Sequence, residues 1–143
     1  MFKKLMLGFK NLIHIRVKDG RVCVEDVYGE EKLEGADELV INSETNQVIE
    51  VGGLSLLVDS TGIIKKNINV FGNIEALPQG AEEIEALLAY YVRKVTKRKV
   101  LLAPEIRLEF IDRKYSLNDQ QKQSLTKICL NIGARAVEIV ESN

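Results

Sequence analysis

The sequence predicts an α/β fold with a tendency to two layers, in which a mixed sheet begins with hairpins and carries its helices mainly on one face. Three observations lead to this prediction. Apolar and polar residues alternate in short runs near the N-terminus, two amphipathic helical patterns follow in the second half, and an alternating run follows each of them. With 143 residues, 45% hydrophobic and 29% charged, the chain suits one globular domain over residues 1–143.

The clearest local prediction is a hairpin within residues 12–27. Between its two alternating runs, Asp19 and Gly20 form a pair that accepts the positive φ angles of a tight type I′ turn. The apolar positions of the two runs are Ile13, Ile15, Val17, Val22 and Val24. We therefore expect two antiparallel strands joined by a two-residue turn.

A second hairpin is predicted from residues 38–41 and 47–51. The segment between them, 42–46, is a cluster of turn-forming side chains. Residues 54–79 show a poor pattern with scattered glycines, and there we expect only short irregular strands.

Two amphipathic helices are predicted in the second half of the chain. The first follows Gly80, has glutamates in its first turns and has basic residues near its end, an order that suits the helix dipole. The second begins near Ser116, which can cap it with Asp119 three residues on, and it ends at Gly133. The apolar stripes comprise Ile84, Leu87, Leu88, Tyr91 and Val95, then Leu125, Ile128, Cys129 and Ile132.

Strands over 105–111 and 136–141 alternate with these helices, so right-handed crossovers would pair the strands in parallel. Strands covered by helices on both faces are apolar throughout, whereas these strands keep one polar face. We therefore expect helices on one side only, with the polar face either solvated or covered by a partner. The candidate partner-face residues are His14, Arg16, Arg107 and Glu109.

Composition argues against several classes of function. Twenty basic and twenty-one acidic side chains give a formal charge of −1, so no net field attracts nucleic acid or an anionic membrane. Cys23 and Cys129 lie in separate elements without a Cys-x-x-Cys pair, which favours buried, inert thiols in a cytoplasmic protein. No apolar run reaches the ~20 residues that a membrane-spanning helix needs.

The N-terminal segment, residues 1–10, is a candidate for weak contact with a membrane surface. Its lysines flank apolar residues that could share one helical face, and so short a segment would bind weakly unless several copies acted together. The alternative is ordinary packing against the domain. The apolar residues are Phe2, Leu5, Met6 and Phe9.

No catalytic, metal-binding or cofactor-binding residue is predicted. His14 is the only histidine, and a lone imidazole on the polar side of a strand is most often solvated. The sequence offers no Ser-His-Asp or Cys-His set, no His/Cys cluster for a metal and no Walker or dinucleotide-binding loop. The basic run over 93–99 suits the C-terminal end of its own helix.

Three stretches resemble the bacterial actin MreB, the rod-shape-determining protein. They read ELVINSETNQVIEVG at 38–52, LLAYYVRKV at 87–95 and QKQSLTKICLNIGARAVEIVE at 121–141. Together with the first hairpin they cover most of the chain. The resemblance implies an actin-like, RNase H-like fold that corresponds to the N-terminal part of the family, without its second nucleotide-binding half.

The positions at which that family binds and hydrolyses ATP differ in this chain. Where the family has Asp-Leu-Gly-Thr, this chain has His14-Ile15-Arg16-Val17, and the long side chain of Arg16 would replace the glycine that lets backbone approach phosphate. Ser142 replaces the family's water-positioning glutamate, with no activating neighbour evident in the sequence. The resemblance therefore implies degenerate ATP-binding motifs and no ATP hydrolysis.

The function that this resemblance implies is a non-catalytic interaction module of the bacterial actin cytoskeleton, acting in cell-shape determination. Its partner would be an actin homologue, a cell-elongation component or another copy of the chain. It would work in the cytoplasm, including at the inner face of the membrane. Two alternatives stay open: a residual ATP-binding domain completed by a partner chain, and a structural subunit of a membrane-associated pilus or secretion assembly.

Overall fold

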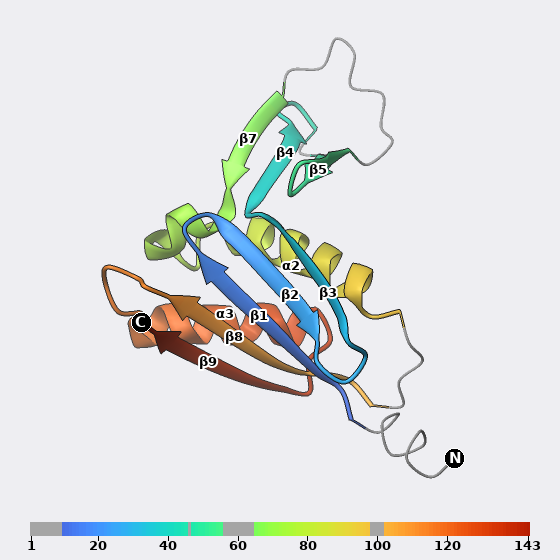
Figure 1. The fold of residues 1–143 in the computed structure, drawn as a ribbon. Coiled ribbons are helices and arrows are strands. Elements are labelled where there is room, and N and C mark those ends of the chain that lie inside the picture. The colour runs from blue at the N-terminus through green and yellow to red at the C-terminus, as the bar shows by residue number, and fades with distance from the viewer. Residues whose placement is uncertain (1–9, 46, 56–64, 98–101) are drawn as a thin grey trace.

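Five strands form the larger of two sheets in the computed structural model, which describes residues 10–45, 47–55, 65–97 and 102–143 (Figure 1). The strand order is β3-β2-β1-β8-β9. β1 pairs antiparallel with β2 and parallel with β8, and β8 pairs parallel with β9. The strands are β1 (Leu12–Lys18), β2 (Arg21–Asp26), β3 (Glu31–Ala36), β8 (Glu105–Ile111) and β9 (Ala136–Ser142). The expected mixed α/β fold is confirmed.

The first hairpin has the predicted turn. Asp19 and Gly20 have φ angles of 47° and 75°, the two positive values that a type I′ turn requires. β3, which pairs antiparallel with β2, was not predicted from the sequence. Its residues EKLEGA contain a single large apolar side chain, Leu33, so no alternation marks the strand, and its pairing with β2 places it in the sheet.

A second sheet, in the order β6-β5-β4-β7, extends beyond the end of the first (Figure 1). It contains the predicted second hairpin. Residues 70–76, expected as irregular strand, instead form a 3₁₀ helix, so that part of the prediction is wrong. The elements are β4 (Glu38–Asn42), β5 (Val48–Val51), β6 (Leu54–Ser55), β7 (Lys65–Asn69) and η1 (Val70–Ala76).

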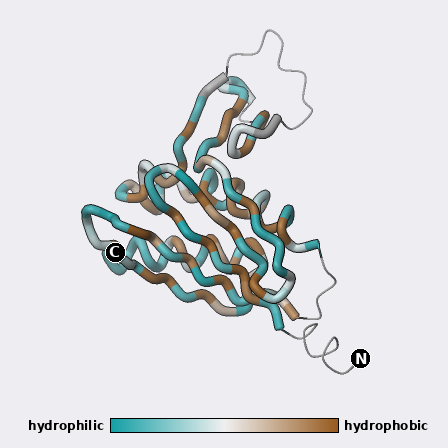
Figure 2. Tube along the Cα trace, viewed as in Figure 1, coloured by the Kyte–Doolittle hydropathy of each residue, from teal (hydrophilic) through white to brown (hydrophobic). Residues whose placement is uncertain are grey.

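Both helices cover the same face of the five-stranded sheet, as predicted from its polar alternation (Figure 1). Figure 2 shows apolar and polar residues alternating along these strands. The helix α2 (Ala81–Val95) buries all five residues of its predicted stripe. Among the described residues, no helix is long and apolar enough to cross a membrane.

The helix α3 (Asp119–Asn131) begins later than the sequence predicted. Asn118, not Ser116, is its N-cap: the Asn118 side chain accepts from the Gln121 N–H at 2.8 Å, and the Gln121 side chain accepts from the Asn118 N–H at 2.9 Å. Leu117 is buried, and its N–H donates to the Glu141 carboxylate on β9 at 2.8 Å. This bond to β9 holds residue 117 outside the helix, so the cap falls on the next residue.

Tyr91 of α2 packs where the two sheets meet. The side chain is 1% exposed, and its hydroxyl donates to the Ala36 carbonyl at 2.9 Å. A Cβ built on Gly35 or on Gly52 would overlap that hydroxyl. Gly35 of β3 and Gly52 of the turn between β5 and β6 therefore make room for Tyr91. Buried side chains from both sheets and both helices belong to one hydrophobic cluster.

Candidate functional site

The four residues predicted as a partner face lie together on the side of the five-stranded sheet that α2 and α3 leave uncovered. We call this side the open face. In the parallel pairing of β1 with β8, His14 lies opposite Arg107 and Arg16 lies opposite Glu109. Neighbouring residues on these strands, such as Ile15 and Leu108, are fully buried on the helix-covered side. The period of two along the strands thus brings the four candidates to one surface.

Glu109 is the centre of a hydrogen-bonded cluster on the open face. Its Oε1 lies 2.9 Å from His14 Nε2 and 3.7 Å from Arg16 Nε, and its Oε2 accepts from the Ser142 hydroxyl at 2.6 Å. Because an ionised carboxylate only accepts, the contact with His14 requires the hydrogen on Nε2. The His14 and Glu109 side chains are only 12% and 15% exposed. His14 is therefore a bonded member of this cluster, whereas the sequence favoured a solvated imidazole.

The sequence did not indicate that Ser142 belongs to this cluster. Ser142 and Glu109 are 33 positions apart and meet only because β9 lies beside β8. A serine nucleophile needs a base with a matched pKa, usually histidine, at its hydroxyl. Here the serine contacts the carboxylate, and His14 contacts the far side of that carboxylate. The cluster therefore orders these side chains but lacks the direct serine–histidine contact of a Ser-His-Asp triad.

The Ser142 hydrogen bond also affects the pKa of Glu109. Together with the His14 contact it holds the pKa of Glu109 below its ordinary value, although partial burial acts in the opposite direction. A carboxyl group whose pKa is lowered on folding stabilises the fold above its unfolded-state pKa, and this stabilisation is lost as the pH falls through its folded-state pKa.

We therefore expect Ser142→Ala to raise the pKa of Glu109. The variant should unfold at lower urea concentration than the wild type at neutral pH, and this difference should disappear below the lowered pKa of Glu109. An NMR titration of the Glu109 carboxyl carbon in both proteins measures the shift directly. An unchanged pKa in Ser142→Ala would show that the hydroxyl does not bind this carboxylate in solution.

Cys23 also lies on the open face, opposite Arg16 in the β1–β2 pairing. The sequence predicted two buried, inert cysteines. This holds for Cys129, whose burial raises its pKa to about 12, but Cys23 is only half-buried. Cys23 alternates with Val22 and Val24, which point to the helices, so its own side chain points to the uncovered side.

These environments predict different thiol reactivity. In the folded protein, a maleimide should label Cys23 and leave Cys129 unlabelled, because only a thiolate attacks and Cys129 is neutral and enclosed. Both should react in denaturant. Intact-mass spectrometry after labelling, with Cys23→Ser as the control, measures this. Two rapid additions to the folded wild type would contradict the burial of Cys129.

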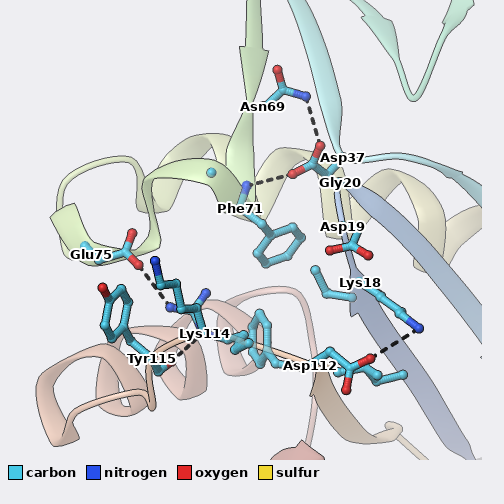
Figure 3. A pocket seen from close by; sticks show the side chains of 15 residues that line it. Lys18, Asp19, Gly20, Asp37, Asn69, Phe71, Glu75, Asp112, Lys114 and Tyr115 are labelled. Carbon is cyan, nitrogen blue, oxygen red and sulfur yellow. Dashed lines mark hydrogen bonds and ion pairs between the residues drawn. The ribbon is translucent and has the colours of Figure 1, made fainter. Parts of the chain in front are cut away.

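A cleft of about 570 Å³ lies at the end of the sheet where β1 and β8 finish and η1 begins (Figure 3). The turn at Asp19 and Gly20 forms one wall. The loop after β8 forms another, with Asp112, Arg113 and Lys114. Arg16 is not one of the described residues that line this cleft. Its guanidinium instead approaches Glu25 and Glu109 on the open face, so it does not enter the space that the family comparison suggested.

Several charged groups of the cleft are already paired with one another. Lys18 Nζ lies 3.3 Å from the Asp112 carboxylate, and Arg113 Nη2 donates to Glu75 at 3.0 Å (Figure 3). Asp37, which is 2% exposed, accepts from the Asn69 amide at 3.0 Å and from the Phe71 N–H at 3.2 Å. An anion entering the cleft would have to compete with these internal pairs.

Among the residues that the structure describes, no group of three metal-ligating side chains occurs. The candidate membrane residues Phe2, Leu5, Met6 and Phe9 lie outside the described residues.

Comparison with known proteins relates this chain to MreB by structure. No family model and no curated protein sequence matches it. A structure of MreB5 of Spiroplasma citri bound to ADP matches with a TM-score of 0.71 and 15% identity, over 94% of this chain and 39% of that one. The same protein bound to AMPPNP matches with a TM-score of 0.71 and 15% identity, over 92% and 38%. The chain thus spans about two fifths of the length of its structural neighbours, and its fold is an MreB-like actin fold that resembles part of MreB.

Proposed function

We propose that this chain is a non-catalytic interaction module that binds a protein partner of the actin cytoskeleton through the open face of its five-stranded sheet. The observation that carries the proposal is the one-sided covering of the sheet by α2 and α3. The uncovered side presents a structured polar surface, in which Glu109 holds His14, Arg16 and Ser142 in place. A surface already ordered before binding loses less side-chain entropy when a partner covers it.

The MreB-like fold supports an actin homologue or a cell-elongation component as that partner. Charges on the open face alternate in sign, with Arg107 Nε 3.7 Å from Glu138 Oε1 and Arg16 Nη2 3.9 Å from Glu25 Oε1. Such a pattern favours a partner whose own charges alternate in a matching register, and it disfavours strongly acidic or basic polymers.

Arg107→Glu is the sharpest variant for testing this face. The Arg107 side chain is 44% exposed and its pair with Glu138 is exposed too, so charge reversal should cost little stability and should lower partner affinity by roughly tenfold or more. Reversal at Arg16 would be less clean, because the new carboxylate would face both Glu25 and Glu109. Lys127→Glu, on the exposed side of α3, is the matched control.

The experiment captures tagged wild type, Arg107→Glu and Lys127→Glu from the same lysate and compares the retained proteins by mass spectrometry. A partner retained by wild type and Lys127→Glu but lost from Arg107→Glu supports the open face. That purified partner should also slow maleimide labelling of Cys23, which lies on the same face. Equal retention by all three variants, with Cys23 labelling unchanged, would overturn the proposal.

The second candidate function is nucleotide binding in the cleft, completed by another chain. The position of the cleft beside the first hairpin turn, and the presence of Lys18 and Lys114 in its lining, favour it. The paired state of Lys18 with Asp112 disfavours it. A ligand at 100 times its dissociation constant adds about 2.7 kcal/mol of stability. Melting curves of the isolated chain across millimolar Mg-ATP test this candidate: an upward shift lost in Lys18→Ala supports nucleotide binding, and a flat curve excludes it for the isolated chain.

A further inference from the structure

A groove of about 470 Å³ lies at the opposite end of β8 from the cleft, where α2 and α3 both end (Figure 1). We call it the end groove. The ends of the two helices form two of its walls, and the residues that lead into β8 form a third. None of the described residues that line it belongs to the open face or to the cleft. Most of the lining is apolar, with Val92, Leu102, Ala103, Pro104 and Ile132.

Asn11 brings an unpaired hydrogen-bond acceptor to the end groove. The residue is 3% exposed, and its side-chain nitrogen donates to the Leu102 carbonyl at 3.0 Å. Because a carbonyl only accepts, the amide nitrogen must face Leu102, and Oδ1 is left on the other side. Among the described residues, this oxygen is the one buried side-chain polar atom without a hydrogen-bond partner. A ligand that donates to it would remove the cost of a buried, unsatisfied acceptor.

The backbone around the groove is already hydrogen-bonded. The Arg135 N–H donates to the Pro104 carbonyl at 2.8 Å, and the Arg135 Nε donates to the Ala103 carbonyl at 3.1 Å. The Val92 carbonyl accepts from both the N–H and the hydroxyl of Thr96, at 3.0 and 2.8 Å. These bonds hold the walls in place, so the groove exists before a ligand binds and little ordering is needed on binding.

Arg93 adds a positive charge at the rim of the groove. It is exposed, and among the described residues no carboxylate pairs with it. A guanidinium binds a carboxylate through two parallel N–H···O bonds. The end of a helix by itself disfavours an anion, so any anionic group held here depends on this side chain.

We propose that the end groove binds the C-terminal residue of a protein partner, and that this residue is apolar. Such a residue offers the three features that the groove lacks. Its amide N–H donates to Asn11 Oδ1, its terminal carboxylate binds Arg93, and its side chain packs on the apolar lining. The residues before it would leave the groove over Leu102, a large apolar side chain that is 43% exposed. This site is separate from the open face, and its test does not depend on the partner proposed there.

The test uses fluorescein-labelled peptides of glycine and serine that end in valine, isoleucine, leucine, methionine or phenylalanine with a free carboxylate. Each is titrated with the full chain, and binding is followed by fluorescence anisotropy. At least one should bind with a dissociation constant below about 1 mM. The same peptide ending in lysine should bind roughly tenfold more weakly or worse, because its charged side chain would meet apolar lining.

Two chemical changes to the best peptide test the two polar contacts without altering the protein. Methylation of the last amide nitrogen removes the donor to Asn11, and amidation of the C-terminus removes the charge that Arg93 binds. Each change should weaken binding to the wild type by roughly tenfold. Methylation should no longer matter in Asn11→Leu, and amidation should no longer matter in Arg93→Gln, because the protein group that each contact needs is already absent.

Lys94→Gln is the matched control, because it removes the same charge from the next residue of α2, which is not one of the described residues that line the groove. It should bind the peptide within about twofold of the wild type. Melting temperatures establish which variants are folded. Asn11→Leu also loses the bond to Leu102, and if it does not fold, methylation in the wild type and the Arg93→Gln comparison still decide the question. Failure of all five peptides to bind would overturn the proposal, as would equal effects of amidation in the wild type and Arg93→Gln.

Discussion

Replacing Gly35 with alanine should lower the free energy of unfolding by about 3 kcal/mol, the upper end of what overpacking a core costs. The new Cβ would overlap the Tyr91 hydroxyl and lie 3.2 Å from its Cζ. Tyr91 cannot easily move aside, because it is 1% exposed and hydrogen-bonded to the Ala36 carbonyl. The backbone of Gly35 does not need a positive φ, so the clash alone accounts for the expected loss.

Removing the hydroxyl should rescue this variant. Tyr91→Phe alone should cost about 1 kcal/mol, the usual value of one hydrogen bond. The double variant Gly35→Ala/Tyr91→Phe should be more stable than Gly35→Ala, because the overlapping oxygen is gone. Urea unfolding of the four proteins gives the coupling energy. Additive losses would show that the clash with Tyr91 is not the cause.

Gly52 provides the comparison that separates a clash from backbone strain. Gly52→Ala should be as damaging as Gly35→Ala or more so, but Tyr91→Phe should rescue it poorly. A Cβ here would still lie 2.9 Å from Tyr91 Cζ and 3.3 Å from the Ala36 carbonyl oxygen. In addition, its φ of 59° is unfavourable for alanine by roughly 1–2 kcal/mol.

Asp37→Ala should also cost about 3 kcal/mol, because it removes the acceptor of two hydrogen bonds at the junction of the sheets. Asp37 lies between β3 and β4, and its carboxylate binds the Asn69 side chain and the Phe71 N–H where β7 meets η1. The variant would leave the buried N–H of Phe71 without its acceptor, so the connection between the two sheets should loosen first.

Hydrogen exchange and urea unfolding together measure this effect. Asp37→Ala should speed amide exchange in η1 and β7 more than in β1. Asp112→Asn is the control, because asparagine tolerates the positive φ of 56° at this position and the ion pair with Lys18 that it removes is about half exposed, worth less than about 1 kcal/mol. Equal losses in the two variants would contradict the structural role given to Asp37.

The sequence by itself determined the elements whose pattern is local. The alternation in β1, β2 and β8, the Asp19–Gly20 turn and the apolar stripes of α2 and α3 each follow from residues that are close along the chain. The polar alternation also indicated correctly that helices cover one face only. The resemblance to MreB, carried by three stretches, agreed with the fold found by structural comparison.

Only the tertiary structure decided how distant residues meet. β3 is a strand because β2 pairs with it, since its own sequence shows no alternation. The N-cap of α3 is Asn118 and not the predicted Ser116, because the Leu117 N–H donates to the Glu141 carboxylate on β9. The Ser142–Glu109 bond joins residues 33 positions apart, and the Tyr91–Ala36 bond joins residues 55 apart. Such contacts depend on strand order and helix placement, so composition and periodicity along the chain do not predict them.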